Sequence, residues 1–580
     1  RGMYVLPGGS QSTVQVELKC FSTMFQSSHN RLIVKGGRIV NHDGKFDADV
    51  YIEDGFIKQI GTNLVIPGGT KVVEARGMYV LPGGMDVNTR LQFSMMGAKS
   101  VDDFYQGTRA ALLGGTTCIM DMAIPDSDCT IIDAYHKRRS EAEGKVCCDF
   151  ALQVGLTSWS DKIKDQMTKL CANGVNSFVL HMAYKNMWQL RDEEIYEILE
   201  TCKELGAIPI IHAENGTLIE KNEEKLKQSG ITGPEGCLLS RPESVEVEAI
   251  TRAMTIAEQV QCPVYFMKVS SRAVAEIISS KKDSLPPVFG EVLVGPLGTD
   301  GSHYSNQCWR HAAGHVTHPP LRNDPQLSSG FLHFLQSNPR TTLSSGHCTF
   351  NSSQKGLGKS DFSKIPPGAN GIEERMSLLW DKGVESGLLD PCDFVRVTSS
   401  NPAKIFNLYP RKGRIQVNSD ADIVIWDPMR TKKISSKRHN ISVDFNIFEG
   451  LELKGAPLCV ICHGKIVFEE DTVRVVEGAG RFISTQCFSP HVYNTDVRGE
   501  QQEKTSASEI SNSKQVSNGM AGSPTRDSEA FHSRGPTRAG GRHMQDSSFS
   551  VSGQQIDDHI PQKSSIKVHN PPGGKSSGFW

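Results

Sequence analysis

The chain has 580 residues, and 63 Lys and Arg residues against 65 Asp and Glu residues give it a formal net charge of −2. This balance excludes the basic surface that nucleic-acid binders and peripheral membrane proteins carry, so neither nucleic acid nor a membrane is an expected partner. No window approaches the ~18 consecutive apolar residues of a membrane span. The 15 cysteines are too sparse for a disulfide scaffold, so we expect a cytoplasmic protein.

The amino-terminal region contains the same nine residues twice. RGMYVLPGG stands at Arg1–Gly9 and again at Arg76–Gly84. The second copy fits a strand that runs into a tight turn, whereas the first precedes a polar stretch with no partner elements. We therefore predict that residues 1–30 form an irregular amino-terminal extension and take no part in the fold.

The middle of the chain, residues 85–400, alternates short apolar runs with longer amphipathic stretches. Helical patterns include Asp102–Leu113, Asp192–Leu205 and Ser244–Val260. Eight alternations of strand and helix predict an α/β fold, a (β/α)8 TIM-like barrel. The eight predicted strands are Met85–Val87, Cys118–Met122, Phe150–Leu156, Ser177–Met182, Ile208–His212, Val264–Val269, Val288–Val294 and Thr342–Gly346.

Two β-rich segments flank the barrel, residues 31–84 and residues 401–485. Turns are predicted at Lys35–Gly37 and Asp54–Gly55 in the first segment. Neither segment is long enough to form a core alone, so we expect both to pair into one small β-sandwich. In the second segment the predicted strands include Ala421–Trp426 and Leu458–Val467.

Residues 486–580 differ in composition from the rest of the chain. This segment is rich in Ser, Gly, Gln, Arg and Pro and has few aliphatic residues. Such a segment buries too little apolar surface to offset the entropy lost on ordering. We predict a disordered C-terminal tail.

Several motifs in the predicted barrel are shared with a known family. They are GVNSF, IIHAENG, GITGPEG, LSRPE, PPLR and NPAKIFNLYPRKGRI. With them the chain resembles the cyclic amidohydrolases of the dihydropyrimidinase type. The resemblance implies two metal ions, held by an H-x-H pair after strand 1, a carboxylated Lys on strand 4, His on strands 5 and 6, and Asp on strand 8. The residues of this chain at the six positions are Asn88, Arg90, Val179, His212, Lys268 and Gly346.

Only His212 of these six residues is a metal ligand of the implied type. Arg90 and Lys268 carry protons and offer no lone pairs, and a divalent metal needs several converging donors. We therefore expect no metal, no other cofactor and no catalytic residue. Arg90 and Lys268 then either pair with nearby carboxylates or line a vestigial pocket for an anionic small molecule. The carboxylates considered are Asp86, Asp121 and Glu214.

Three other residues at the strand ends have structural interpretations. Tyr184 matches the oxyanion-stabilising Tyr that the resemblance implies, but a hydrogen-bond donor alone does not make an enzyme. We interpret Tyr184 and His347 as packing or polar-network residues, and His212 as a hydrogen-bonded barrel histidine. Cys147 and Cys148 are interpreted as buried or free thiols.

The sequence Cys459-Val460-Ile461-Cys462-His463 matches the C-x-x-C-H pattern of covalent haem attachment. It lies in an alternating strand pattern, where positions i and i+3 face opposite sides of a sheet. The two thiols are therefore expected to point apart and to hold neither haem nor zinc.

A barrel that keeps its scaffold without its metal ligands resembles the collapsin response mediator proteins. VNTR, YFMKVSS, SGHCTFN and FNIFEGLELKGAP carry this closer resemblance. It implies a non-catalytic cytosolic phosphoprotein that forms homo- or hetero-tetramers with family paralogues, binds tubulin or microtubules, and acts in semaphorin-dependent axon guidance and neuronal growth. An active zinc-dependent cyclic amidohydrolase is the alternative.

The resemblance also implies regulation by protein kinases that act on the tail. Ser523-Pro524 resembles the family's proline-directed priming site, but Gly519 and Gln515 stand where the family has further acceptors upstream. Each phosphate adds about −2 charge and weakens binding to an acidic partner such as tubulin. The candidate phosphorylation sites are Ser523, Thr525, Thr537, Ser564 and Ser565.

Overall fold

The computed structural model describes residues 30–126 and 128–493. The first copy of the nine-residue repeat and all candidate phosphorylation sites lie outside these residues. In the second copy, strand β5 (Tyr79–Pro82) leads within two residues into strand β6 (Gly84–Thr89). The residue boundaries of the predicted domains stay predictions.

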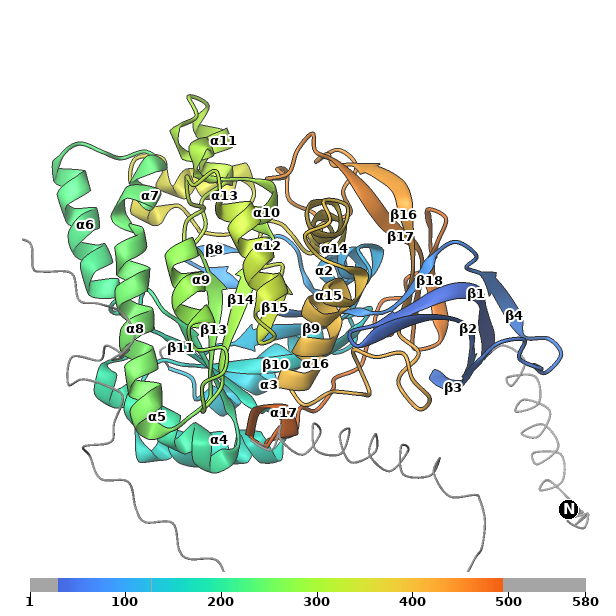
Figure 1. The fold of residues 1–580 in the computed structure, drawn as a ribbon. Helices are drawn as coiled ribbons and strands as arrows, with labels where there is room; N and C mark the ends of the chain where they lie inside the picture. Colours follow the sequence, from blue (N-terminus) through green and yellow to red (C-terminus); the bar gives the residue numbers. More distant parts are fainter. Residues whose placement is uncertain (1–29, 127, 494–580) are drawn as a thin grey trace, which may run out of the picture. The chain divides into compact units, whose positions relative to one another are not determined.

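The eight predicted barrel strands are all present and form one parallel sheet (Figure 1). Each pairs with the next in chain order, and a bridge between Thr89 and His347 links the last strand segment to the first. The predicted α/β barrel is confirmed. Its strands are β6, β9 (Thr116–Ala123), β10 (Asp149–Leu156), β11 (Ser177–His181), β12 (Ile208–His212), β13 (Val264–Val269), β14 (Val288–Leu293) and β15 (Thr341–Ser344).

The barrel strands are buried on both faces, as continuous apolar runs in parallel sheets predict. All eight residues of β9 and all eight of β10 are buried. Alternate residues enter two separate cores. Met120 and Val179 belong to the core inside the barrel, whereas Ile119 and Leu180 pack against the surrounding helices.

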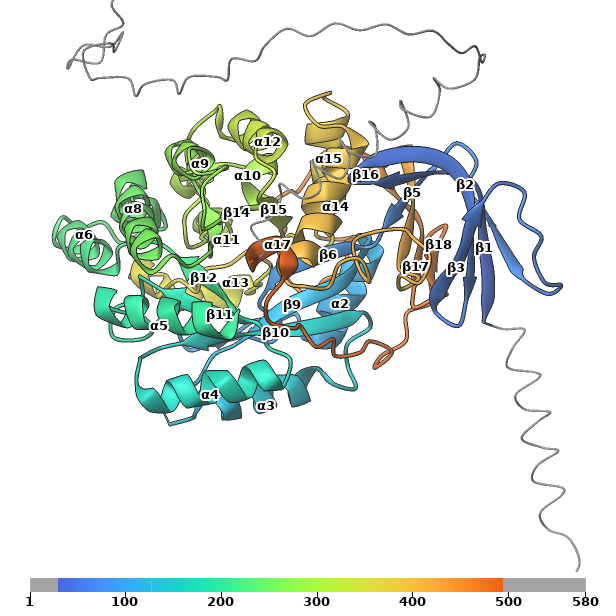
Figure 2. The same ribbon diagram turned by 60° about the horizontal axis from the view of Figure 1, so that its bottom comes forward.

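Helices cover the outside of the barrel (Figure 2). The predicted helix Asp192–Leu205 is α5 with the same bounds, and Gly206 ends it in the left-handed conformation (φ 66°). The helices are α2 (Phe104–Leu113), α3 (Ile131–Ala142), α4 (Asp161–Ala172), α5, α6 (Gly216–Gln228), α7 (Glu235–Ser240), α8 (Glu243–Val260), α9 (Arg272–Ser279), α10 (Gly295–Gly298), α11 (Trp309–Gly314), α12 (Leu327–Ser337), α13 (Ser352–Lys355), α14 (Arg375–Leu379), α15 (Pro391–Val395), α16 (Asn401–Ile405) and α17 (Pro490–Tyr493).

The two flanks combine as predicted, in one nine-stranded sheet. Antiparallel pairing of β5 with β16 joins the first flank to the second. The sheet folds back on itself, because Ile57 exchanges backbone hydrogen bonds with Ser419 and Asn418 at 3.0 and 2.8 Å. Strands of both flanks share one core. The remaining strands are β1 (Arg31–Asn41), β2 (Gly44–Glu53), β3 (Phe56–Gly61), β4 (Lys71–Glu74), β16 (Ile423–Lys433), β17 (Glu452–Cys462), β18 (Lys465–Glu469) and β19 (Thr472–Val473). A short hairpin, β7 (Ser94–Met95) with β8 (Ala98–Lys99), lies apart from both sheets.

Two local predictions in the flanks are wrong. Lys35–Gly37 is not a turn but a bulge within β1, where the pairing with β2 shifts register. Leu458–Val467 is not one strand, because His463 and Gly464 adopt positive φ values of 51° and 72° and form the turn between β17 and β18. The turn at Asp54–Gly55 is confirmed, with φ values of 53° and 82°.

A group of buried charges, which we call the floor cluster, lies at the amino end of β10. Lys412 Nζ contacts carboxylate oxygens of Asp149 at 2.6 Å, Asp420 at 2.9 Å and Asp422. Although burial opposes the charge, the three carboxylates raise the pKa of Lys412. The cluster ties the second flank to the barrel.

The C-x-x-C-H motif lies beside the floor cluster. His463 Nε2 is 2.5 Å from Asp149 Oδ1, so the histidine is part of the charge network. Cys459 packs in the core of the flanking sheet, whereas Cys462 packs in the core around the barrel. The thiols point to opposite faces, as predicted. Cys147 and Cys148 are both buried and free.

Candidate functional site at the barrel mouth

The carboxyl ends of the barrel strands surround a pocket, which we call the mouth pocket. Four of the six positions inferred from the resemblance line it: Arg90, His212, Lys268 and Gly346. Asn88 and Val179 lie on β6 and β11 and do not reach the pocket. The other lining residues are Phe93, Met95, Met122, His181, Tyr184, Trp188, Met267, Leu293, Thr317, His318, Cys348, Pro367 and Gly368.

Asn88 is held below the pocket by a buried hydrogen-bond chain. Its Nδ2 donates to Glu291 Oε1 at 2.6 Å, and Tyr265 donates to the other oxygen of Glu291 at 3.0 Å. Burial raises the pKa of Glu291 to about 7. Val179 is fully buried in the core inside the barrel. The Asn88 and Val179 side chains are therefore part of the barrel interior and do not line the pocket.

Arg90 and Lys268 are the two cations of the mouth pocket. Arg90 is 6% exposed and donates to the Thr89 carbonyl at 2.7 Å. Lys268, a partly buried residue with φ 59°, reaches the His318 carbonyl at 3.4 Å. Burial, reinforced by the charge of Arg90, lowers the pKa of Lys268 to about 8. Among the described residues, neither cation has a carboxylate within ion-pairing distance.

Nearby carboxylates have other partners, so the interpretation that they pair with Arg90 or Lys268 is wrong. Asp121 forms a buried ion pair with Arg138 at 2.6 Å, and Glu214 forms one with Arg241 at 2.9 Å. Asp86 accepts hydrogen bonds from the backbone N–H groups of Ser345 and Asn88. The sequence did not reveal these arginines, because they lie on helices and loops outside the strand ends.

His212 contributes a ring nitrogen that is already engaged. Its Nε2 lies 3.0 Å from Glu214 Oε2, and its ring stacks on Tyr184 with centroids 5.5 Å apart. Burial lowers the pKa of His212, which favours the neutral imidazole. The hydrogen bond agrees with the structural interpretation of His212, and the expectation that His212 binds no metal stays a prediction.

His347 and Tyr184 also have the roles interpreted from the sequence. The Nε2 of His347 lies 3.1 Å from Asp102, and its Nδ1 accepts from the Gly371 N–H at 3.3 Å. His347 thus joins two loops and does not line the mouth pocket. Tyr184 packs its ring against His212 and lines the pocket.

Gly346 has no side chain that could bind a metal. Glycine suits this position because of its backbone conformation. Its φ is 63°, in the left-handed region that favours glycine. A Cβ there would lie 2.7 Å from Leu293 Cδ1. An Asp at this position would need both a strained backbone and a moved Leu293, so the ligand is not restored by a single substitution.

Three titratable residues of the mouth pocket were not identified as site residues from the sequence. They are His181 on β11, and His318 and Cys348 on loops after β14 and β15. His181 packs between the rings of Trp188 and His212, at 5.1 and 5.6 Å. Burial lowers the pKa of both His181 and His318 far below the usual range. His181 is two positions after Val179 on the same strand, so both side chains lie on the same face of the sheet. Because Val179 stands at an implied ligand position, this spacing is the sequence signal that indicates His181.

The mouth pocket does not fit a binuclear metal centre. Arg90 and Lys268 would repel a divalent ion, and of the six ligand positions that the resemblance implies only His212 keeps its donor. In the described part of the chain, groups of three or more His, Cys, Asp or Glu ligand atoms converge elsewhere. Two of these groups belong to the floor cluster and its neighbours, and the third is His303, His311 and His315.

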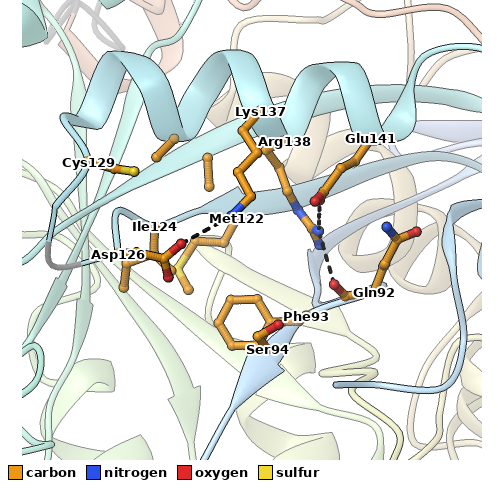
Figure 3. Close-up of a pocket in the computed structure, with 12 residues that line it drawn as sticks. Gln92, Phe93, Ser94, Met122, Ile124, Asp126, Cys129, Lys137, Arg138 and Glu141 are labelled. Atoms are coloured by element: carbon orange, nitrogen blue, oxygen red, sulfur yellow. Dashed lines mark hydrogen bonds and ion pairs between the residues drawn. The ribbon is translucent and has the colours of Figure 1, made fainter. Parts of the chain in front are cut away.

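A second hollow lies beside the mouth pocket, under helix α3 (Figure 3). Phe93 and Met122 line both cavities. Its charged side chains are paired with each other, Lys137 with Asp126 at 3.1 Å and Arg138 with Glu141 at 3.0 Å. This hollow therefore offers less uncompensated charge than the mouth pocket.

Comparisons with known proteins agree with this architecture. The model of the amidohydrolase family matches residues 79–285 and 334–467. The chain belongs to this family. Human dihydropyrimidinase-related protein 5 is 43% identical over 568 residues, which cover 96% of this chain and 99% of that protein. Dihydropyrimidinase from Rattus norvegicus is 50% identical over 480 residues, which cover 82% of this chain and 92% of that protein.

Solved structures of family members share the fold. The dihydropyrimidinase from Brevibacillus agri aligns with a TM-score of 0.77 at 32% identity, covering 79% of this chain and 99% of that one. D-hydantoinase from Thermus sp. aligns with a TM-score of 0.77 at 34% identity, covering 80% of this chain and all of that one. The predicted resemblance is confirmed. No helix within the described ranges is long and apolar enough to cross a bilayer.

Proposed function

We propose that this amidohydrolase-family member is a non-catalytic relative of dihydropyrimidinase. The observation that carries the proposal is that Arg90 and Lys268 line the mouth pocket at two positions where the resemblance implies metal donors. Opening a cyclic amide needs a strong nucleophile, which a metal-activated hydroxide supplies in a metal-dependent hydrolase. Five of the six ligand positions that the resemblance implies lack the implied donor.

The role proposed in place of catalysis is that of a cytoplasmic signalling and cytoskeletal adaptor. Similarity to human dihydropyrimidinase-related protein 5 over 96% of the chain supports this choice. The adaptor binds tubulin or microtubules in semaphorin-dependent axon guidance, and assembles as homo- or hetero-tetramers with family paralogues. Kinases that act on Ser523, Thr525, Thr537, Ser564 or Ser565 weaken the tubulin contact, because each phosphate adds about −2 charge.

The catalytic half of the proposal is tested with dihydrouracil. Purified chain is incubated with Zn²⁺, and ring opening is followed with and without a chelator, with a dihydropyrimidinase as the positive control. We expect no chelator-sensitive turnover. Turnover that the chelator abolishes would contradict the proposal.

The alternative function is an active zinc-dependent cyclic amidohydrolase. Its support is the 50% identity to the rat dihydropyrimidinase and the place of Tyr184 in the mouth pocket. Two zinc ions per chain, together with dihydrouracil ring opening, would establish this alternative.

The adaptor half is tested by co-sedimentation with tubulin. Full-length chain is compared with a chain that ends at Tyr493. Residues up to Tyr493 are kept because Phe488 N donates a hydrogen bond to the Gly206 carbonyl at 2.8 Å, and the Tyr493 hydroxyl donates one to the Ala207 carbonyl. We expect weaker sedimentation of the shortened chain and of a Ser523→Asp/Thr525→Asp variant. Absence of binding by every form would refute the tubulin assignment, and equal binding would refute regulation through the tail.

A further inference from the structure

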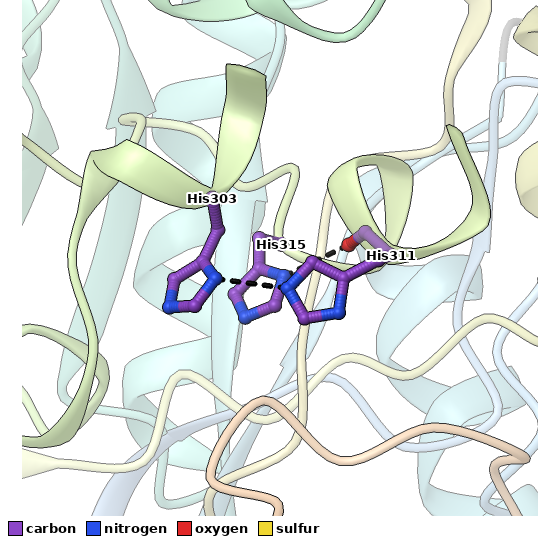
Figure 4. A group of neighbouring side chains, drawn as sticks. All are labelled: His303, His311 and His315. Atoms are coloured by element: carbon purple, nitrogen blue, oxygen red, sulfur yellow. Dashed lines mark hydrogen bonds between the residues drawn. The ribbon is translucent and has the colours of Figure 1, made fainter. Parts of the chain in front are cut away.

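Three histidines meet on the long connection between β14 and α12, outside the mouth pocket. His303 lies in the 3₁₀ turn Gly301–Ser305, His311 lies on α11, and His315 follows the end of α11. Figure 4 shows the three rings side by side. We call this group the histidine cluster.

The ring nitrogens of the histidine cluster converge. His303 Nδ1 and His311 Nε2 are 2.8 Å apart, and each of the three residues places one nitrogen within 4.8 Å of the other two. The rings of His303 and His315 are stacked at 4.2 Å and 7°. In a tetrahedral zinc site the Zn–N bonds of ~2.0–2.1 Å place ligand nitrogens about 3.3 Å apart. Binding an ion at that spacing requires rotations of the side chains that end the parallel stacking of His303 on His315.

The hydrogen bonding of His315 leaves one of its ring nitrogens with a free lone pair. Its Nδ1 lies 2.9 Å from the His311 carbonyl oxygen, an acceptor, so this nitrogen carries the proton. Nε2 is then the free acceptor, the arrangement typical of a metal-ligating histidine whose other nitrogen donates to a backbone carbonyl. Neutral imidazole is the form that binds metal.

The surroundings hold two of the ligands and leave one side accessible. The Phe445 ring packs edge-on against His311 and His315 at 5.7 and 5.3 Å. Asp300 accepts from the Ser302 N–H at 2.8 Å and fixes the turn that carries His303. Since His303 and His311 are partly exposed, an ion and a further ligand can enter from solvent.

We propose that His303, His311 and His315 form a binding site for a divalent transition-metal ion, Zn²⁺ above all, with one coordination position open to solvent. Three imidazoles suit Zn²⁺, Cu²⁺ or Ni²⁺, whereas Mg²⁺ and Ca²⁺ require oxygen ligands. The bound ion joins the turn of His303 to α11. It also steadies the following residues Thr317 and His318, which form one wall of the mouth pocket.

The site is tested by calorimetric titration of untagged, full-length chain with Zn²⁺. We expect one ion per chain and a loss of affinity of at least tenfold in His311→Ala. His333→Ala is the matched control, because His333 is exposed on α12. His212→Ala reports on the mouth pocket, and both control variants are expected to bind as the wild type does.

A thermal-unfolding measurement provides a second readout. Zn²⁺ is expected to raise the Tm of the wild type and of His333→Ala but not that of His311→Ala, and Mg²⁺ is expected to raise none of them. Equal Zn²⁺ binding by His311→Ala and His333→Ala would overturn the proposed site, as would no binding at all. Loss of Zn²⁺ only in His212→Ala would overturn this proposal and also place a metal at the mouth pocket.

Discussion

Buried cations occur at both ends of the barrel, and their surroundings differ. At the floor cluster, Lys412 is surrounded by Asp149, Asp420 and Asp422. At the mouth pocket, Arg90 and Lys268 have backbone carbonyls as neighbours and no described carboxylate within ion-pairing distance. A buried charge is costly unless it is paired. We therefore expect the floor charges to stabilise the fold and the mouth charges to destabilise it.

The largest expected effect comes from removing the floor cation. Lys412→Met leaves three buried carboxylates without their shared partner, so the free energy of unfolding should fall by about 3–5 kcal/mol. Urea unfolding at neutral pH measures the change. Lys221→Met is the matched control, since the Lys221 side chain is 57% exposed and solvent screens its charge, so its loss should leave the free energy of unfolding nearly unchanged. Equal stability of the two variants would contradict the assigned role of the floor cluster.

Removing a mouth cation should have an effect of opposite sign that depends on pH. The pKa of Lys268 in the folded chain is about 8, below the unfolded value of about 10.4. Between these two values the unfolded chain binds more protons, so the charge of Lys268 destabilises the fold at neutral pH and this penalty disappears as pH rises. The penalty is at most about 3 kcal/mol, from ~1.4 kcal/mol per pKa unit.

The corresponding variant is Lys268→Met, compared with the wild type and with Lys162→Met, an exposed control. Urea unfolding at pH 7.5 and pH 10 should show the wild type gaining stability relative to Lys268→Met at the higher pH. Lys162→Met should follow the wild type. If the stability difference between wild type and Lys268→Met did not change with pH, the prediction would be wrong. That result would mean that a negative charge compensates Lys268 in the folded chain.

The smallest effect is expected at the hollow beside the mouth pocket. Lys137 and Asp126 form a pair at 3.1 Å, with side chains 62% and 72% exposed. Lys137→Met should change the free energy of unfolding by no more than about 0.5 kcal/mol, because solvent screens an exposed pair. A loss of more than about 1.5 kcal/mol in the free energy of unfolding, measured with urea, would contradict this expectation. It would mean that the exposed pair stabilises the fold as the buried floor cluster does.

The fold was predictable because its signals are local. Eight apolar runs separated by helical patterns sufficed for the barrel, and β12, β13 and α5 have the predicted bounds. The flanking strands were less predictable. Bulges and two-residue turns depend on single φ angles, such as those of His463 and Gly464, which an alternating apolar pattern does not reveal.

The candidate site was predictable only in part. Position by position, the resemblance located Arg90, His212 and Lys268 at the mouth pocket. The partners of the nearby carboxylates were not predictable, because Arg138 and Arg241 reach Asp121 and Glu214 from a helix and a loop outside the strand ends. The histidine cluster was missed for a different reason. Its residues lie only eight and four positions apart, but they belong to an irregular connection outside the strand ends that the sequence analysis considered.

The most direct test of whether the histidine cluster binds zinc and the mouth pocket does not is anomalous diffraction at the zinc edge, from crystals grown with Zn²⁺. The account predicts one peak among the rings of His303, His311 and His315, and none beside His212. Two peaks about 3.5–4 Å apart at the mouth pocket, the spacing of two-metal hydrolytic centres, would contradict it.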